Sequence, residues 1–186
     1  MIDKILVAVD KTERGKSVFT AALSLAKATD ASLISLHVLS EENYDYPVFP
    51  TYVYYQVLKN APDSMYQQEW LQYEQQGINF LQDLTKEATK AGVDAEYVQL
   101  SGVPGWEICE LASAWSVDLI VVGSRGLKGV KEMFIGSVSN YVTHHAPCSV
   151  LIVRADTDSI PNSNNMLDQK REEADSKQET STNYFV

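Results

Sequence analysis

The segment with the strongest chemical signal is a glycine-bearing stretch between an apolar run and a later helix pattern. It reads VVGSRGLKGVKEMFIGSVSN from Val121 to Asn140. Glycines such as Gly123, Gly126 and Gly129 let backbone N–H groups point into one concavity. The helix that begins near Gly136 adds the unpaired N–H groups and the partial positive charge of a helix N-terminus. This combination is typical of a cradle for phosphate groups.

Side chains in the same stretch favour the same interpretation. Ser137 and Ser139 could donate hydroxyl hydrogen bonds to phosphate oxygens. Arg125, Lys128 and Lys131 place positive charge beside the glycines, although the whole chain has a formal net charge of −10. These basic side chains of an otherwise acidic chain therefore lie where a phosphate would bind.

Asp10 stands at the end of the first apolar run. If that run and the one before Gly123 form neighbouring strands, Asp10 lies next to the cradle. Its carboxylate could then accept hydrogen bonds from ribose hydroxyls or hold a magnesium-bound water. Each residue taken singly has a simpler interpretation: the glycines can form an ordinary turn, Ser137 can cap its own helix, and Asp10 can cap the first helix.

Alternating strand and helix patterns predict the frame that would position these groups. Five short apolar runs are predicted as buried strands: Asp3–Asp10, Ser32–Leu39, Asp94–Leu100, Asp118–Val122 and Ser149–Val153. The predicted helices run from Thr12 to near Asp30, up to Gly92, from near Pro104, and from Ser137 to His145. This order predicts an α/β fold, a doubly wound five-stranded parallel sheet with helices on both faces and the first strand at its centre. Ligands of such sheets bind outside the carboxyl ends of the strands.

Composition excludes several classes of function. A chain of 186 residues with 45% hydrophobic residues can form one soluble domain with a substantial core. The acidic balance argues against nucleic-acid binding. No apolar run reaches the roughly 20 residues of a membrane span and no signal-peptide pattern is seen, so a cytoplasmic protein is expected. Cys109 and Cys148 lack metal-site spacing and are interpreted as small buried apolar residues.

Two stretches do not follow the alternation. We assign residues 1–155 to one domain, which contains an insertion at about 40–66 that is rich in tyrosine. This insertion could be a structural flap, a partner surface or a lid over a ligand. Residues 156–186 carry seven acidic and three basic side chains with few apolar ones, and are predicted to form a disordered acidic tail.

The joint spacing Gly123-x2-Gly126-x9-Gly136-Ser137, with Asp10 ending the first strand, resembles the ATP-binding branch of the universal stress protein family. The resemblance extends from Met1 to Arg154. It includes the opening KILVAVD, the His37-Val38 pair and the closing run HHAPCSVLIV. One departure is Lys11-Thr12-Glu13, where many members have a serine-rich turn, and it leaves the geometry at the ribose open.

The resemblance implies that the chain binds ATP together with Mg²⁺, and Asp10 is the candidate metal ligand on the chemical grounds given above. The adenosine would contact Ala8, Val9 and Asp10, and the adenine would contact Val38. The ribose and phosphates would be surrounded by Gly123, Ser124, Arg125, Gly126, Leu127, Lys128 and Gly129. The phosphate tail would be bound by Gly136, Ser137, Val138 and Ser139.

These features predict a nucleotide-dependent regulatory or binding module of the stress response. Two alternatives stay open: a slow Mg-dependent ATP hydrolase or phosphotransferase, and a protein-interaction module with a vestigial nucleotide site. No base beyond Asp10 is found near the expected γ-phosphate, so no catalytic residue is predicted. The last strand, Ser149–Val153, would leave an apolar edge, which predicts a homodimer through it. Family members commonly pair there, and an unidentified protein partner is also compatible with the insertion.

Overall fold

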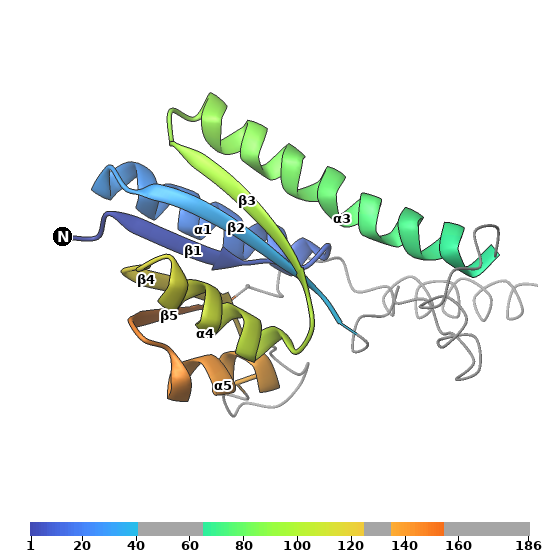
Figure 1. Ribbon diagram of the computed structural model, residues 1–186. Coiled ribbons are helices and arrows are strands. Elements are labelled where there is room, and N and C mark those ends of the chain that lie inside the picture. The colour runs from blue at the N-terminus through green and yellow to red at the C-terminus, as the bar shows by residue number, and fades with distance from the viewer. Residues whose placement is uncertain (41–64, 125–134, 155–186) are drawn as a thin grey trace, which may run out of the picture. The chain divides into compact units, whose positions relative to one another are not determined.

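The computed structural model describes residues 1–40, 65–124 and 135–154, which belong to one compact unit, Met1–Ala155. Strands and helices alternate along it, as Figure 1 shows. The strands are β1 (Lys4–Ala8), β2 (Ser32–Leu39), β3 (Ala95–Ser101), β4 (Leu119–Gly123) and β5 (Ser149–Val153). The helices are α1 (Glu13–Thr29), α3 (Met65–Lys90), α4 (Pro104–Ala114) and α5 (Ser137–His145). The predicted tail and nearly all of the predicted insertion lie outside the described residues and stay predictions.

The five strands form one sheet with the order β3-β2-β1-β4-β5, and every neighbouring pair is parallel. β1 is the central strand, as predicted. The chain passes from β1 to β2 and β3 on one side, and only then crosses to β4 and β5 on the other. The strand order therefore reverses between β1 and β4, which is the point where sheets of this kind bind their ligands.

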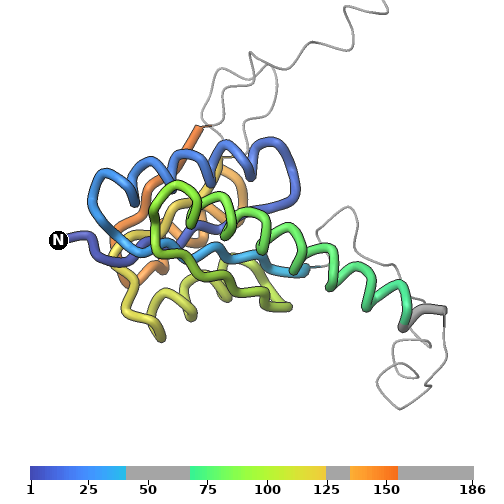
Figure 2. The backbone as a smooth tube through the Cα atoms, turned by 90° about the horizontal axis from the view of Figure 1, so that it is seen from above, coloured from blue at the N-terminus to red at the C-terminus, as the bar shows by residue number. Residues whose placement is uncertain are grey.

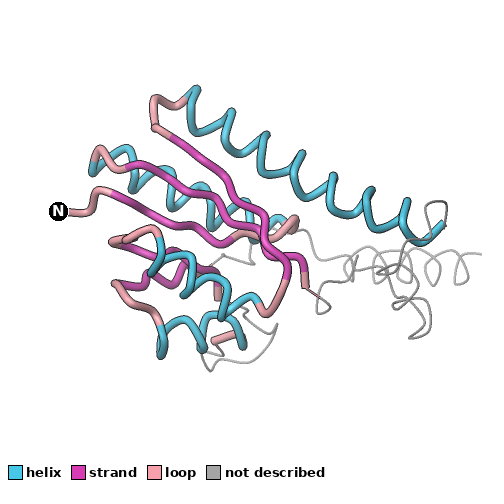
Figure 3. The backbone as a smooth tube through the Cα atoms, viewed as in Figure 1, coloured by secondary structure: helices cyan, strands magenta, loops and turns pink. Residues whose placement is uncertain are grey.

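Within the described residues, two helices cover each face of the sheet. Phe19 of α1 and Leu81 of α3 are buried in one core cluster, and Figure 2 shows these two helices from above. Ile108 of α4 and Val142 of α5 are buried in a second cluster on the opposite face. Figure 3 shows the resulting layers, with the strands between the helices. The predicted doubly wound α/β fold is confirmed.

Local signals for the helix ends also agree with the structure. Pro104 is the first residue of α4, where its missing N–H leaves no helical hydrogen bond unmade. Gly92, just after α3, has a φ of +83°, a conformation that glycine adopts without steric cost. Cys109 is buried and Cys148 is partly buried, both as free thiols against the α4 and α5 face. Burial raises the pKa of both thiols, which suits an apolar packing role.

The start of α1 lies tightly against the end of β1. Thr12 is the N-cap of α1, because its hydroxyl oxygen accepts the N–H of Gly15 at 3.2 Å. Asp10 Oδ1 in turn accepts the N–H of Thr12 at 3.1 Å and the Thr12 hydroxyl. The alternative that Asp10 itself caps α1 is therefore wrong. A Cβ atom on Gly15 would lie 2.1 Å from the Asp10 carbonyl oxygen, so only glycine permits this close approach.

Asp118, just before β4, links the amino end of this strand to that of β1 by hydrogen bonds. Its Oδ2 accepts the N–H groups of Asp3 and Lys4, both at 2.9 Å, just before and at the start of β1. These two backbone hydrogen bonds lower the pKa of the Asp118 carboxyl, since they favour its charged form.

The linkage between this pKa and stability gives a first prediction. Because the folded-state pKa lies below the ordinary value of 3.8, the carboxylate stabilises the fold above that pH, and this stabilisation is lost as the pH falls through the folded-state pKa. We expect Asp118→Asn to lower the free energy of unfolding at pH 7, and we expect this difference from the unchanged protein to shrink progressively as the pH falls below about 4. Urea unfolding at several pH values measures the difference in unfolding free energy and its dependence on pH.

Asp94→Asn is the matched control, because no hydrogen bond to the Asp94 side chain is found among the described residues and Asp94 lies at the same edge, before β3. It is expected to change the unfolding free energy little at any pH. A constant difference between Asp118→Asn and the unchanged protein across the pH range would contradict the prediction.

Candidate functional site

A pocket of about 130 Å³ lies at the carboxyl ends of β1, β2 and β4, where the strand order reverses. Nine of the residues predicted for nucleotide binding line it: Ala8, Val9, Asp10, Val38, Gly123, Ser124, Gly136, Val138 and Ser139. Ser137 is outside this lining, and its side chain is exposed. Arg125, Gly126, Leu127, Lys128 and Gly129 fall outside the described residues, as does Lys131, so their roles stay predictions. The tertiary structure thus brings together residues from both ends of the domain.

One wall of the pocket is apolar. Val38 of β2 and Ile108 of α4 are 8% and 1% exposed, and Pro104 at the start of α4 extends the same wall. Leu36 and Val122 complete it from neighbouring strands. A concave apolar surface of this kind suits a flat ring with little charge, such as a nucleobase.

A second part of the pocket wall is formed by the N-terminus of α5. Its N-cap is Gly136, with φ −60° and ψ 160°, and no side chain of the described residues caps it. The alternative that Ser137 is the cap is wrong, because Ser137 is the first helical residue. The first-turn N–H groups have no carbonyl partner inside the helix, and no acidic side chain lies in that turn. This end of α5 can therefore receive an anion.

Ser139 connects this helix to β4. It is 3% exposed, and its hydroxyl donates a hydrogen bond to the carbonyl oxygen of Gly123. A serine hydroxyl has one proton, so in this arrangement the side chain of Ser139 does not donate to a phosphate. Its backbone N–H, in the first turn of α5, does not compete with that bond. The bond instead holds the first turn of α5 next to the end of β4.

Asp10 supplies the carboxylate of the pocket. Its Oδ1 is engaged by Thr12, as described above, and Oδ2 receives no hydrogen bond among the described residues. The sequence left open how the Lys11-Thr12-Glu13 turn affects the site. In the structure, Thr12 of this turn orients the Asp10 carboxylate. Lys11 points its ammonium at the ring of Tyr73, 5.0 Å from the ring centroid.

A magnesium ion fits this site only with help from a ligand. The described part of the chain holds no group of three or more His, Cys, Asp or Glu side chains that could bind a metal by itself. Mg²⁺ is commonly held by one or two carboxylates together with the phosphates of a bound nucleotide. Asp10 is suited to that arrangement, in which the protein provides one carboxylate.

Several residues of the lining had no role assigned from the sequence. The most polar are Arg14 of α1 and His37 of β2. His37 is 2% exposed, and its Nδ1 lies 3.4 Å from Gln99 Oε1. The position of Arg14 could have been found from the sequence. It stands four residues before Val18, and this helical spacing places it on the same face of α1 as the apolar stripe. His37 was noted only as part of the family resemblance.

The comparisons with known proteins agree with this fold and motif pattern. The model of the universal stress protein family matches residues 1–154. Universal stress protein Sll1388 of Synechocystis sp. is 35% identical over 81% of this chain and 97% of its own. Universal stress protein YxiE of Bacillus subtilis is 36% identical over 83% of this chain and 100% of its own.

Solved structures show the same fold. A universal stress protein in complex with cAMP aligns with a TM-score of 0.55 at 24% identity, over 81% of this chain and 96% of that one. A universal stress protein family protein from Arabidopsis thaliana with AMP bound aligns with a TM-score of 0.57 at 22% identity, over 87% and 97%. No helix in the described residues is long and apolar enough to cross a membrane. With its family model matched over nearly all of the folded unit, this chain belongs to the universal stress protein family.

Proposed function

We propose that the pocket binds ATP with Mg²⁺ and that the protein acts as a nucleotide-dependent regulatory module of the stress response, in the cytoplasm. The observation that carries this proposal is the placement of three complementary surfaces around one pocket. These are the apolar wall at Val38, the carboxylate of Asp10, and the uncapped N-terminus of α5 at Gly136. A base, a sugar hydroxyl or metal, and a phosphate need surfaces of these three kinds.

The placement of each ligand part follows from those surfaces. The adenine lies on Val38, and the ribose lies by Ala8, Val9 and Asp10. The phosphates extend from the end of β4, at Gly123 and Ser124, to the first turn of α5, at Gly136 to Ser139. The adenine class is supported by the two proteins of the same fold that carry AMP and cAMP. The residues from Arg125 to Gly129 belong to this proposal by their family motif alone.

Gly136→Val tests the phosphate site. The φ of −60° at Gly136 is open to any residue, so the backbone tolerates valine, while its side chain would lie over the first-turn N–H groups of α5. We expect the affinity for ATP to fall by more than about tenfold, about 1.4 kcal/mol, with a melting temperature lowered only by the few degrees that a poorer N-cap costs. Isothermal titration measures the ATP affinity, and circular dichroism measures the melting temperature.

Asn140→Val is the control for Gly136→Val, because Asn140 is exposed on the same helix and outside the pocket lining. It is expected to bind ATP as the unchanged protein does. Equal affinity of Gly136→Val and the unchanged protein would place the phosphates elsewhere and overturn the proposed site.

Asp10→Asn tests the metal. The amide keeps an oxygen that can accept from Thr12, but it loses the negative charge that Mg²⁺ needs. We expect the variant to weaken Mg-ATP binding by about tenfold and ATP binding in EDTA by less. Asp94→Asn, with the same charge change at the opposite edge of the sheet, should alter neither. Equal losses with and without Mg²⁺ would assign Asp10 to the ribose.

We also propose that two copies pair through β5. This strand is an edge of the sheet, and Leu151 on it is 38% exposed. Unpaired apolar edges are usually covered by another chain or blocked by charge. Leu151→Lys should therefore shift the protein from dimer to monomer in sedimentation at micromolar concentration. Leu71→Lys on α3, where the leucine is 55% exposed, should leave the dimer intact. An unchanged protein that sediments as a monomer would refute the pairing.

A further inference from the structure

Arg14 is placed beside the end of β4 by the geometry of α1. Val18 packs on Gly123 so closely that a Cβ atom on this glycine would lie 2.8 Å from Val18 Cγ2. Residues four apart lie on the same face of a helix, one turn from each other. Arg14 therefore lies one turn nearer the start of α1, beyond the last residue of β4, and it lines the pocket together with Gly123 and Ser124.

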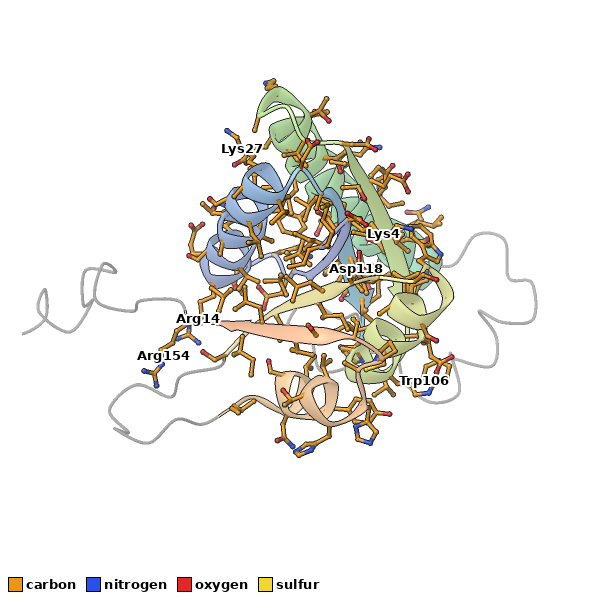
Figure 4. All side chains as sticks on the ribbon, turned by 90° about the vertical axis from the view of Figure 1, so that its left-hand side faces the viewer. Lys4, Arg14, Lys27, Trp106, Asp118 and Arg154 are labelled. Carbon is orange, nitrogen blue, oxygen red and sulfur yellow. The ribbon has the colours of Figure 1, made fainter. Side chains whose placement is uncertain are left out.

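Arg154 follows the neighbouring strand and lies outside the pocket lining, next to its edge. In the β4–β5 pair, Gly123 is the partner of Val153, and the N–H of Ser124 donates to the Val153 carbonyl at 2.9 Å. The next residue along the chain is Arg154, so its backbone begins beside Ser124. Figure 4 shows the Arg14 and Arg154 side chains on the same side of the molecule, where β5 ends. We call these two residues the arginine pair.

No protein group among the described residues neutralises the arginine pair. The ion pairs found there join Lys16 to Glu13 and Lys86 to Asp83, and neither arginine has a hydrogen bond or an ion pair. Asp10, which lines the same pocket, has its Oδ1 occupied by Thr12. Arg14 is also partly buried, which makes an uncompensated charge costly. A partly buried guanidinium and an exposed one beside the pocket therefore suit an anionic ligand bound there.

The position of the arginine pair determines which part of a bound nucleotide these two side chains can contact. The bond from Ser139 to Gly123 holds the first turn of α5 against the end of β4, and α5 and α1 cover opposite faces of the sheet. Arg14 therefore lies across the end of β4 from the α5 N-terminus, and Arg154 follows the end of the neighbouring strand β5. A single phosphate on α5 occupies only that N-terminus, whereas a chain of phosphates can cross the end of β4. A guanidinium binds such phosphate oxygens with two parallel N–H donors.

We propose that Arg14 and Arg154 bind the outer phosphates of the nucleotide and make the pocket select nucleoside di- and triphosphates over monophosphates and cyclic monophosphates. This inference rests on the proposed nucleotide function and goes beyond it. It assigns the discrimination between nucleotides with different numbers of phosphates to two side chains outside the glycine motif.

The test compares ATP, ADP, AMP and cAMP by isothermal titration on the full chain and on Arg14→Gln, Arg154→Gln and the double variant. The double variant is expected to lose about tenfold or more in ATP affinity and less than about twofold in AMP affinity, since the outer phosphates of ATP reach the pair and AMP has none. Arg14→Lys keeps the charge but loses the two-pronged donor geometry, so its ATP affinity should lie between those of the unchanged protein and Arg14→Gln. Arg154 is exposed, so Arg154→Gln is not expected to affect folding.

Lys27→Gln is the matched control, because it removes one positive charge from the last turn of α1, far along the helix from Arg14. It should bind all four nucleotides as the unchanged protein does. Equal losses of ATP and AMP affinity in the double variant, or no loss of ATP affinity, would overturn the role of the arginine pair alone. An unchanged protein that binds AMP as tightly as ATP would overturn the selectivity. An unchanged protein that binds none of the four would overturn the proposed function itself.

Discussion

The parallel pairing of β1 with β4 is the contact on which the pocket depends. Ile5, Leu6 and Val7 pair with Leu119, Ile120 and Val121 in register, and these side chains are almost completely buried. Because the two strands run in step, the chain leaves both at the same edge of the sheet. Asp10 after β1 and Ser124 after β4 therefore meet at that edge, although they are far apart in the sequence. Without this pairing, the carboxylate and the glycine motif would have no common site.

Close contacts at that edge keep the pocket in shape. On one side, Gly15 permits α1 to begin directly against Asp10, and Thr12 holds the Asp10 carboxylate. On the other side, the hydroxyl of Ser139 holds α5 to the end of β4. These contacts use small side chains and backbone atoms, so the walls of the pocket are set by the packing of the helices. The arrangement leaves the first-turn N–H groups of α5 directed at the space between the walls.

Charge is distributed differently at the two edges of the sheet. At the amino edge, Asp118 uses its carboxylate to accept backbone N–H groups, so its role is structural. At the carboxyl edge, Asp10 is held through one oxygen, and the arginine pair has no protein anion among the described residues. A net charge of −10 disfavours polyanions in general, while the arginines at the carboxyl edge would favour a small anionic ligand at that one place.

The sequence by itself determined the elements and their order. Apolar runs of strand length, helical stripes, and markers such as Pro104 and Gly92 are local signals, so the bounds of α5 and β5 match the predicted ranges. The glycine spacing and Asp10 were enough to indicate the family and the edge of the sheet at which a ligand would bind. The tertiary structure was needed to show that Thr12 caps α1, that the Ser139 hydroxyl donates to Gly123, and that Arg14 and Arg154 both lie near the end of β4. The physical reason is that hydrogen bonds and side-chain contacts between distant segments depend on strand register and helix packing, which local periodicity does not record.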